Sequence, residues 1–342
     1  MVDARAWLLW AVGVLVFASS CRNPVYALLA LAIVALCDAA WARSGERRGL
    51  PSPLRFAALA IPLAAVFSML VSHLGDTVLL RLPDGWPLIG GALTLESVVF
   101  GATNGLVLSL IYGAFSLVNR VTPVHDLLRL IPGALHEAGV VLSIALAFIP
   151  QTQRSLARIR EAQAVRGHRL RGLRDWLPIV VPLLISGLER SMGLAEAMVA
   201  RGYGTIEGRA RAASLQALLA CGLLGTVGGW LAWSFFPAAA LWGAGGLAIG
   251  VAMLFAALRL AGRGTRRTHY RSASWGAEEN LVTAGVAVAL LGTLAPLPFL
   301  HREVLAYAPY PRLSVPPVDP LLALLLLGLL VPAALAVGWG ER

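Results

Sequence analysis

Long apolar runs recur along this chain and constrain its fold more strongly than any other feature. A helix needs about 20 apolar residues to cross a hydrocarbon layer about 30 Å thick, and it pairs its own backbone groups there. With 58% hydrophobic and only 13% charged residues, the composition lies far outside the range of soluble domains. The sequence therefore predicts an all-α integral membrane protein with about eight transmembrane helices. The runs, of which the first and seventh are short, cover residues 6–20, 25–42, 55–74, 97–119, 212–236, 238–262, 281–297 and 319–338.

The distribution of arginine predicts how these helices cross the membrane. All 28 basic side chains are arginine, because the chain contains no lysine. If the N-terminus is cytoplasmic and the runs alternate, the arginines gather on the inner side, as the positive-inside rule requires. The exceptions are Arg22, Arg81, Arg302 and Arg312. This topology places both termini in the cytoplasm. It also keeps residues 120–210 on the inner side, despite apolar stretches at 138–150 and 176–188.

Four segments follow from this topology. Residues 1–119 hold the first four transmembrane helices, and residues 120–210 form a cytoplasmic-side domain of amphipathic helices. Residues 211–262 hold the next two spans, and residues 263–342 hold a basic linker and two extra C-terminal spans. Outside the membrane, residues 75–96 indicate a turn-rich hairpin or loop around Val78-Leu79-Leu80. GxxxG spacing, which allows close helix approach in lipid, occurs at Gly225 and Gly229 and again at Gly246 and Gly250.

A short pattern, Glu-Ala-x-x-x-Arg-Gly, occurs twice in the most arginine-rich part of the chain, at residues 161–167 and 196–202. Each copy ends a stretch with helical character, so each is expected at a helix tip. A guanidinium stays charged when desolvated and offers a rigid fork of donors to carboxylates and carbonyls. The duplication predicts a docking device. Its residues are Ala164, Arg166, Gly167, Ala200, Arg201 and Gly202, with Glu161 and Glu196 either in the same surface or neutralising nearby arginines until a partner binds.

Each Arg-Gly pair also has a purely structural explanation. Glycine is preferred just beyond a helix C-terminus, and the helix dipole favours a cation there by about 0.3–1 kcal/mol. Two copies in register, each preceded by Glu-Ala, favour function over this explanation.

The second copy ends a predicted helix, residues 182–201, that has two different faces. At about 100° per residue, one narrow stripe is apolar and is expected to pack on an apolar surface. The opposite side combines arginines with small residues and is expected to accept a second protein. The apolar stripe consists of Ile185, Leu188, Met192, Ala195 and Val199, and the opposite side of Ser186, Arg190, Gly193, Ala197 and Arg201.

These features resemble the transmembrane T component of energy-coupling factor (ECF) transporters, including the CbiQ-type subunits of cobalt and nickel uptake systems. The matching residues are Ala164-Val165-Arg166-Gly167, Ala200-Arg201-Gly202 with Tyr203, and Ala147-Phe148-Ile149-Pro150. The resemblance covers about residues 20–262. It implies cytoplasmic coupling helices whose two arginine tips dock into two ATP-binding-cassette ATPase subunits, with Arg166 and Arg201 as the docking arginines.

The resemblance further implies that a separate S component carries the substrate-binding site, and it leaves a metal ion, a vitamin or another micronutrient open as the substrate. It places the protein in the plasma membrane of a prokaryote and implies no nucleic acid partner. The chain departs from the family's pattern at Val165, where alanine is usual, and in its extra C-terminal spans.

Several functions are not supported by the residues present. Without lysine there is no Walker A lysine, so ATP hydrolysis is expected from partner subunits and the chain is predicted not to be an enzyme. The histidines and the cysteines lack metal-ligand or paired spacing, so no cofactor and no metal site is predicted. The alternative is a membrane-embedded enzyme or an autonomous permease whose basic inner loops bind anionic lipid. It would need titratable residues facing a cavity within the membrane, and Asp38, His73 and Glu96 all lie near the ends of spans.

Overall fold

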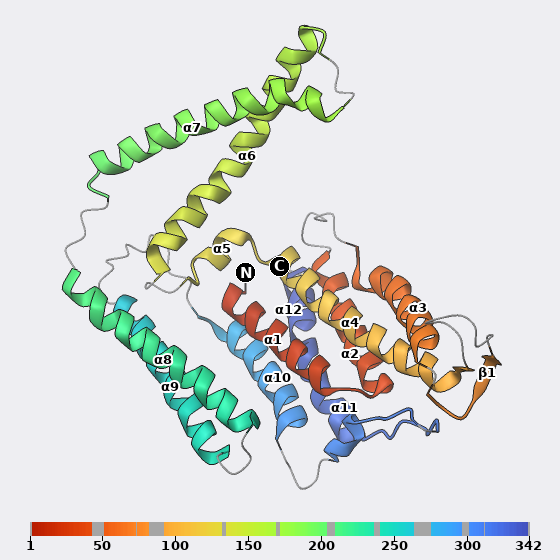
Figure 1. Ribbon diagram of the computed structural model, residues 1–342. Coiled ribbons are helices and arrows are strands. Elements are labelled where there is room, and N and C mark those ends of the chain that lie inside the picture. The colour runs from red at the N-terminus through yellow and green to blue at the C-terminus, as the bar shows by residue number, and fades with distance from the viewer. Residues whose placement is uncertain are drawn as a thin grey trace. The chain divides into compact units, whose positions relative to one another are not determined.

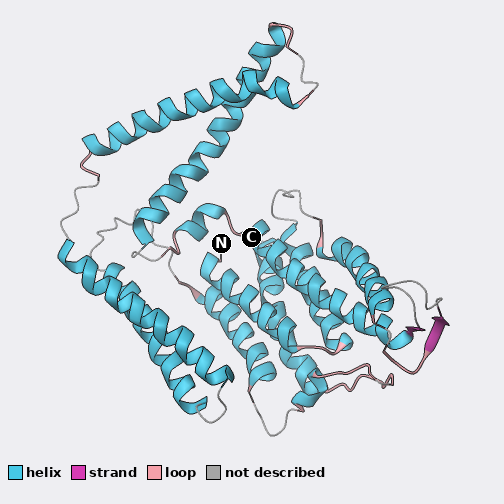
Figure 2. Cartoon of the chain, in the orientation of Figure 1, coloured by secondary structure: helices cyan, strands magenta, loops and turns pink. Residues whose placement is uncertain are grey.

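The computed structural model describes residues 2–42, 51–72, 74–81, 92–131, 135–168, 172–203, 209–235, 240–262, 275–295, 301–310 and 312–340. These residues are mainly helical (Figure 2), which confirms the predicted all-α class. The chain forms two compact units, one of Met1–Leu127 with Arg271–Arg342 and the other of Leu128–Tyr270. The division into four segments expected from the topology stays a prediction.

The first unit is built from helices at both ends of the sequence (Figure 1). Its N-terminal part contains α1 (Ala4–Ser20), α2 (Pro24–Ala42), α3 (Pro53–Val71) and α4 (Leu95–Val121), and its C-terminal part begins with α10 (Ala277–Leu294). The last apolar run forms α11 (Pro320–Leu326), the 3₁₀ turn η5 (Leu327–Leu330) and α12 (Val331–Gly340). Side-chain caps mark several starts: Asp3 accepts from Arg5 N–H, and Ser52 from Arg55 N–H.

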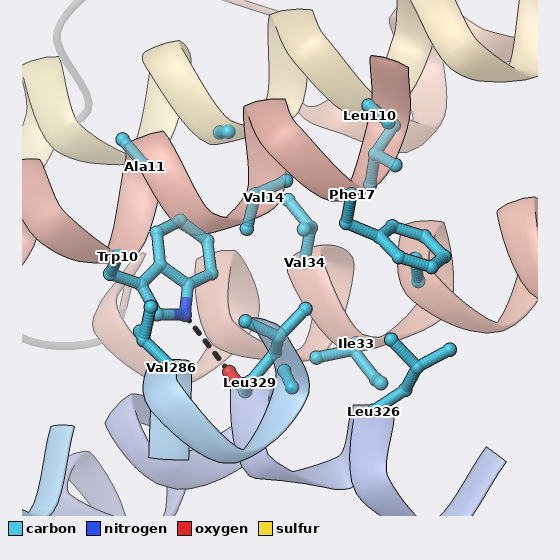
Figure 3. Close-up of a cluster of buried hydrophobic side chains, with 14 of the residues drawn as sticks. Trp10, Ala11, Val14, Phe17, Ile33, Val34, Leu110, Val286, Leu326 and Leu329 are labelled. Atoms are coloured by element: carbon cyan, nitrogen blue, oxygen red, sulfur yellow. Dashed lines mark hydrogen bonds between the residues drawn. The ribbon is translucent and has the colours of Figure 1, made fainter. Parts of the chain in front are cut away.

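The core of this unit forms where α1 meets the other helices (Figure 3). Phe17 of α1, Ile33 of α2 and Leu110 of α4 are all buried there. The C-terminal helices share the same core, because Val286 of α10 and Leu329 of η5 pack into it. Figure 3 also shows the indole N–H of Trp10, which donates to the Leu329 carbonyl at 3.0 Å.

A proline lies next to the interruption of the last helix. Pro332 has no backbone N–H, and its ring disfavours a continuous α-helix. Side chains of other helices donate to carbonyl groups near the interruption. Trp10 donates to the Leu329 carbonyl, and Trp41 Nε1 donates to the Pro332 carbonyl at 3.0 Å.

The turn between α1 and α2 fixes the segment that precedes α11. Asn23 is buried, and its side-chain amide donates to the carbonyls of Val304 (2.8 Å) and Pro317 (2.9 Å). The Tyr26 hydroxyl accepts from Asp319 N–H at 2.6 Å. The extra C-terminal helices therefore complete the N-terminal bundle. A short turn, η4 (Arg302–Leu305), lies in this segment.

The predicted hairpin is confirmed in part. Strand β1 (Val78–Arg81) pairs antiparallel with β2 (Ala92–Thr94). Glu96, at the start of α4, accepts hydrogen bonds from the backbone and hydroxyl groups of Thr77, which ties the hairpin to the helix. The glycine- and proline-rich turn between the strands lies outside the described residues.

The second unit contains two helix pairs, α6 (His136–Val165) with α7 (Leu177–Ala200), and α8 (Arg209–Phe235) with α9 (Ala240–Gly262). The GxxxG glycines form the α8–α9 interface. A Cβ on Gly225 would lie 3.2 Å from Gly250 Cα, and one on Gly229 would collide with backbone atoms of Leu247 and Gly243. The close helix approach predicted from these glycines is confirmed as internal packing.

Among the described residues, eight helices are long and apolar enough to cross a membrane, which agrees with the predicted number. The set differs from the predicted one. It includes α6 and α7, whereas α1 and the interrupted C-terminal helix are shorter apolar helices. A short helix, α5 (Val124–Leu128), precedes α6. The inner-side location of residues 120–210 stays a prediction.

Candidate docking site

The two Arg-Gly motifs lie at the C-terminal ends of α6 and α7, as the sequence predicted. Arg166 is the C-cap residue directly after α6, and Arg201 is the C-cap residue directly after α7. The glycines that follow have left-handed backbone conformations, with φ of +77° at Gly167 and +78° at Gly202.

Both helices end with the same pair of backbone hydrogen bonds. At the first tip, Gly167 N–H donates to the Ala164 carbonyl at 2.9 Å, and His168 N–H donates to the Gln163 carbonyl at 3.0 Å. This pattern, with a left-handed glycine, is the Schellman motif.

At the second tip, the equivalent donors are Gly202 to the Val199 carbonyl (2.9 Å) and Tyr203 to the Met198 carbonyl (3.0 Å). The structural explanation for each glycine is therefore correct. The Schellman motif also holds the backbone next to both arginines in the same conformation.

Neither glycine is required by packing. A Cβ placed on Gly167 or on Gly202 would meet nothing within 4 Å. The positive φ alone accounts for glycine at these positions, because residues with a Cβ atom rarely adopt this backbone conformation.

Contacts between α6 and α7 fix where the tips lie along the pair. Gln163 Nε2 donates to the Pro178 carbonyl at 3.3 Å, so the first tip lies beside the start of α7. The guanidinium of Arg160 lies 5.8 Å from the Trp176 ring, within the turn η2 (Leu173–Trp176). The second tip ends the same helix, and at 1.5 Å per residue it lies roughly 35 Å farther along α7.

The loop between the helices is closed by a polar contact. His168 Nε2 lies 2.7 Å from the Asp175 carbonyl oxygen, and the Asp175 carboxylate accepts from Gly172 N–H at 2.9 Å. His168 therefore has a structural partner. The described residues contain no group of three or more potential metal ligands.

All predicted docking residues are exposed: Glu161, Ala164, Arg166, Gly167, Glu196, Ala200, Arg201 and Gly202. An apolar side chain precedes each tip, with Val165 90% exposed and Val199 72% exposed. The ion pairs that join described residues involve Arg120, His301 and Arg312, and the role of Glu161 and Glu196 stays a prediction.

The two faces predicted for α7 are only partly as expected. The apolar stripe is exposed, with Leu188 at 65% and Met192 at 64%. The opposite side faces α6 at Arg190, which donates to the Ser155 hydroxyl at 3.2 Å and lies 5.9 Å from the Phe148 ring. Arg190 therefore has a partner within the chain, and the expectation that this side of α7 accepts a second protein stays a prediction.

Comparisons with known proteins identify relatives of this chain. Residues 2–212 match the family described as cobalt transport protein, CbiQ. The protein named energy-coupling factor transporter transmembrane protein EcfT of Streptococcus thermophilus is 33% identical over 134 residues, covering 34% of this chain and 51% of the relative. The protein of the same name from Bacillus selenitireducens is 28% identical over 226 residues, covering 61% of this chain and 81% of the relative.

A third relative with this name, from Exiguobacterium sibiricum, is 42% identical over 82 residues, or 22% of this chain and 31% of the relative. The chain spans about half or less of the length of the first relatives it matches. The family match ends at residue 212, so α10, α11 and α12 lie beyond it.

Proposed function

This chain belongs to the CbiQ family of cobalt transport proteins, and on that premise we propose that it is the transmembrane T component of an energy-coupling factor transporter. In this role it transmits conformational changes of two ATP-binding-cassette ATPase subunits to a separate S component that binds the substrate. The substrate class proposed is a micronutrient, either a metal ion such as cobalt or nickel, or a vitamin. The membrane is the plasma membrane of a prokaryote.

The observation that carries this proposal is the duplicated helix tip. Arg166 and Arg201 follow helices with the same terminal hydrogen bonds, and both are exposed. Their separation of roughly 35 Å along α7 gives each tip room for its own globular partner. Because the two tips are held by one helix pair, movement of the two partners would be delivered to the same element.

The chemistry of each tip suits a protein groove. The guanidinium can donate to carboxylates and to backbone carbonyls, while the exposed valine beside it can fill an apolar pocket. Val165 and Val199 therefore join the arginines in the proposed docking surface. The apolar stripe on α7 supports contact with the bilayer or with the S component, because Leu188 and Met192 are mostly exposed.

The source of energy is assigned to the partners. The chain has no lysine, so it cannot supply the P-loop lysine that holds ATP phosphates. We therefore assign hydrolysis to the ATPase subunits and a mechanical role to this chain.

Of the three titratable residues weighed for a membrane-embedded enzyme or an autonomous permease, His73 lies outside the described residues. Asp38 forms an ion pair with Arg120 at 2.8 Å, and Glu96 accepts a hydrogen bond from the Thr77 hydroxyl. Both carboxylates thus have structural partners.

Co-purification tests the proposal. Tagged wild-type chain, expressed with its ATPase subunits, is expected to retain them in detergent, and the Arg166→Glu/Arg201→Glu variant is expected to lose them. Retention of the ATPases by that variant would refute the docking role.

A further inference from the structure

Two arginines from different helices converge on one buried serine where α6 meets α7. Ser155 is only 6% exposed, and its hydroxyl oxygen accepts hydrogen bonds from Arg158 Nη2 and Arg190 Nη2, both at 3.2 Å. Arg158 comes from the next turn of α6, whereas Arg190 reaches across from α7 and lies against Phe148. The shared acceptor holds the two guanidinium groups close together.

Within the described residues, no carboxylate forms an ion pair with Arg158 or Arg190, since the ion pairs there involve other basic residues. The hydroxyl that both arginines bind is neutral, so the two cations repel one another. Each guanidinium also has five N–H groups and gives one of them to Ser155. An anion with several oxygen atoms satisfies both requirements, and the guanidinium fork fits phosphate geometry.

The surroundings favour a lipid phosphate over a free phosphate ion. On α6, the face with Ser155 continues through Phe148 to Val141, which is mostly exposed. On α7, the side with Arg190 continues through Leu194 and Met198, which are half-buried. Apolar side chains therefore extend from the basic pair, as an acyl chain requires, and basic pockets between membrane helices bind anionic headgroups.

We propose that Arg158 and Arg190, held together by Ser155, bind the phosphate group of an anionic phospholipid. The site is distinct from both Arg-Gly tips, and the inference does not depend on ATPase docking. Lipid bound there ties the crossing of α6 and α7 to the membrane surface.

The test is native mass spectrometry of the purified full-length chain in detergent, without ATPase subunits, titrated with phosphatidylglycerol. Wild type is expected to bind phosphatidylglycerol, and Arg158→Gln and Arg190→Gln are each expected to bind it about tenfold more weakly. Arg154→Gln is the matched control. It removes the same charge from the residue next to Ser155, where the side chain is exposed and forms no ion pair with another described residue, and it is expected to bind as wild type does.

Three results would overturn the proposal. The first is that Arg154→Gln weakens phosphatidylglycerol binding as much as Arg158→Gln and Arg190→Gln do, and the second is that wild type binds phosphatidylcholine as tightly as phosphatidylglycerol. The third is that millimolar inorganic phosphate displaces phosphatidylglycerol, which would assign the site to a free anion. If Arg190→Gln does not fold, Arg190→Lys keeps the charge but loses the fork, and it is expected to bind several-fold more weakly than wild type. Wild-type affinity in Arg190→Lys and in Arg158→Gln would also contradict the proposal.

Discussion

Gly167 and Gly202 end two successive helices in the same left-handed conformation, with φ values of +77° and +78°. Each donates its N–H to the carbonyl three residues before it, at 2.9 Å in both cases. The arginine before each glycine is thereby presented in the same way at both helix ends. This shared geometry makes the two motifs equivalent units and supports one function for both.

Replacing either glycine is expected to disturb the tip without disturbing packing. Gly202→Ala and Gly167→Ala should each cost about 1–2 kcal/mol locally, because alanine is strained at positive φ. The expected result is faster hydrogen exchange at His168 or Tyr203 and weaker ATPase binding, measured by exchange mass spectrometry and co-purification.

Gly193→Ala is the control for these variants. Gly193 lies inside α7, and a Cβ there would also meet nothing within 4 Å. Alanine is expected to stabilise this helix slightly, by about 0.5–1 kcal/mol. If Gly193→Ala weakened ATPase binding as much as Gly202→Ala does, the effect would not arise from the tip.

The α8–α9 interface makes a second comparison possible between neighbouring glycines. Gly229→Ala would push a methyl group into the backbone of α9, whereas a Cβ on Gly228 meets nothing within 4 Å. Gly229→Ala should lower stability by about 1–3 kcal/mol, since overpacking of backbone against backbone is costly. Thermal unfolding of Gly229→Ala and Gly228→Ala in detergent measures the difference. Equal melting temperatures for the two variants would contradict the close packing of Gly229 against α9.

The buried ion pair in the first unit should show strong coupling. Arg120 Nη1 lies 2.8 Å from Asp38 Oδ1, with side chains 9% and 6% exposed. Arg120→Gln should lower the free energy of unfolding by about 3–5 kcal/mol, because it leaves the buried Asp38 charge without its partner. Adding Asp38→Asn to this variant should restore most of the lost stability. A double-mutant cycle of thermal unfolding tests this, and additive effects would show that the pair is not coupled.

Asp319 should give the stability a pH dependence. Its pKa is held below the ordinary aspartate value, chiefly because Leu321 N–H donates to the carboxylate, with smaller effects from His301 and an opposing effect of burial. A lowered pKa stabilises the fold above the ordinary aspartate pKa of about 3.9, and this contribution is lost as pH falls through the folded pKa.

The comparison with Asp319→Asn isolates this contribution. Melting temperatures of both proteins should be measured from about pH 3 to pH 7. Wild type should lose stability at the acidic end more steeply than the variant. Parallel pH profiles would contradict the assigned role of the carboxylate.

The sequence predicted the helical class and the helix ends at the two Arg-Gly motifs, because both depend on local patterns. Apolar length determines which segments form long helices, and the Gly-terminated Schellman ends depend on a few adjacent residues. The apolar stripe on α7 was also visible, since a helix repeats about every 3.6 residues.

Features that depend on distant residues could not be predicted in this way. Asn23 binds the carbonyls of Val304 and Pro317, nearly 300 residues away, so no local pattern shows that the C-terminal helices complete the first bundle. The contact between Arg190 and Ser155 likewise depends on how α6 crosses α7. That crossing is why the sequence did not show that Arg190, on the face expected to accept a partner protein, contacts Ser155 of α6.

The most direct test of the docking account is the number of ATPase subunits held by single-tip variants. Native mass spectrometry of complexes purified in detergent should show two ATPase subunits on wild type and on the Arg154→Glu control. One subunit is expected on Arg166→Glu or Arg201→Glu, and none on the double variant, because reversing one interfacial charge costs about 2–5 kcal/mol. Two ATPase subunits on the double variant would contradict the account.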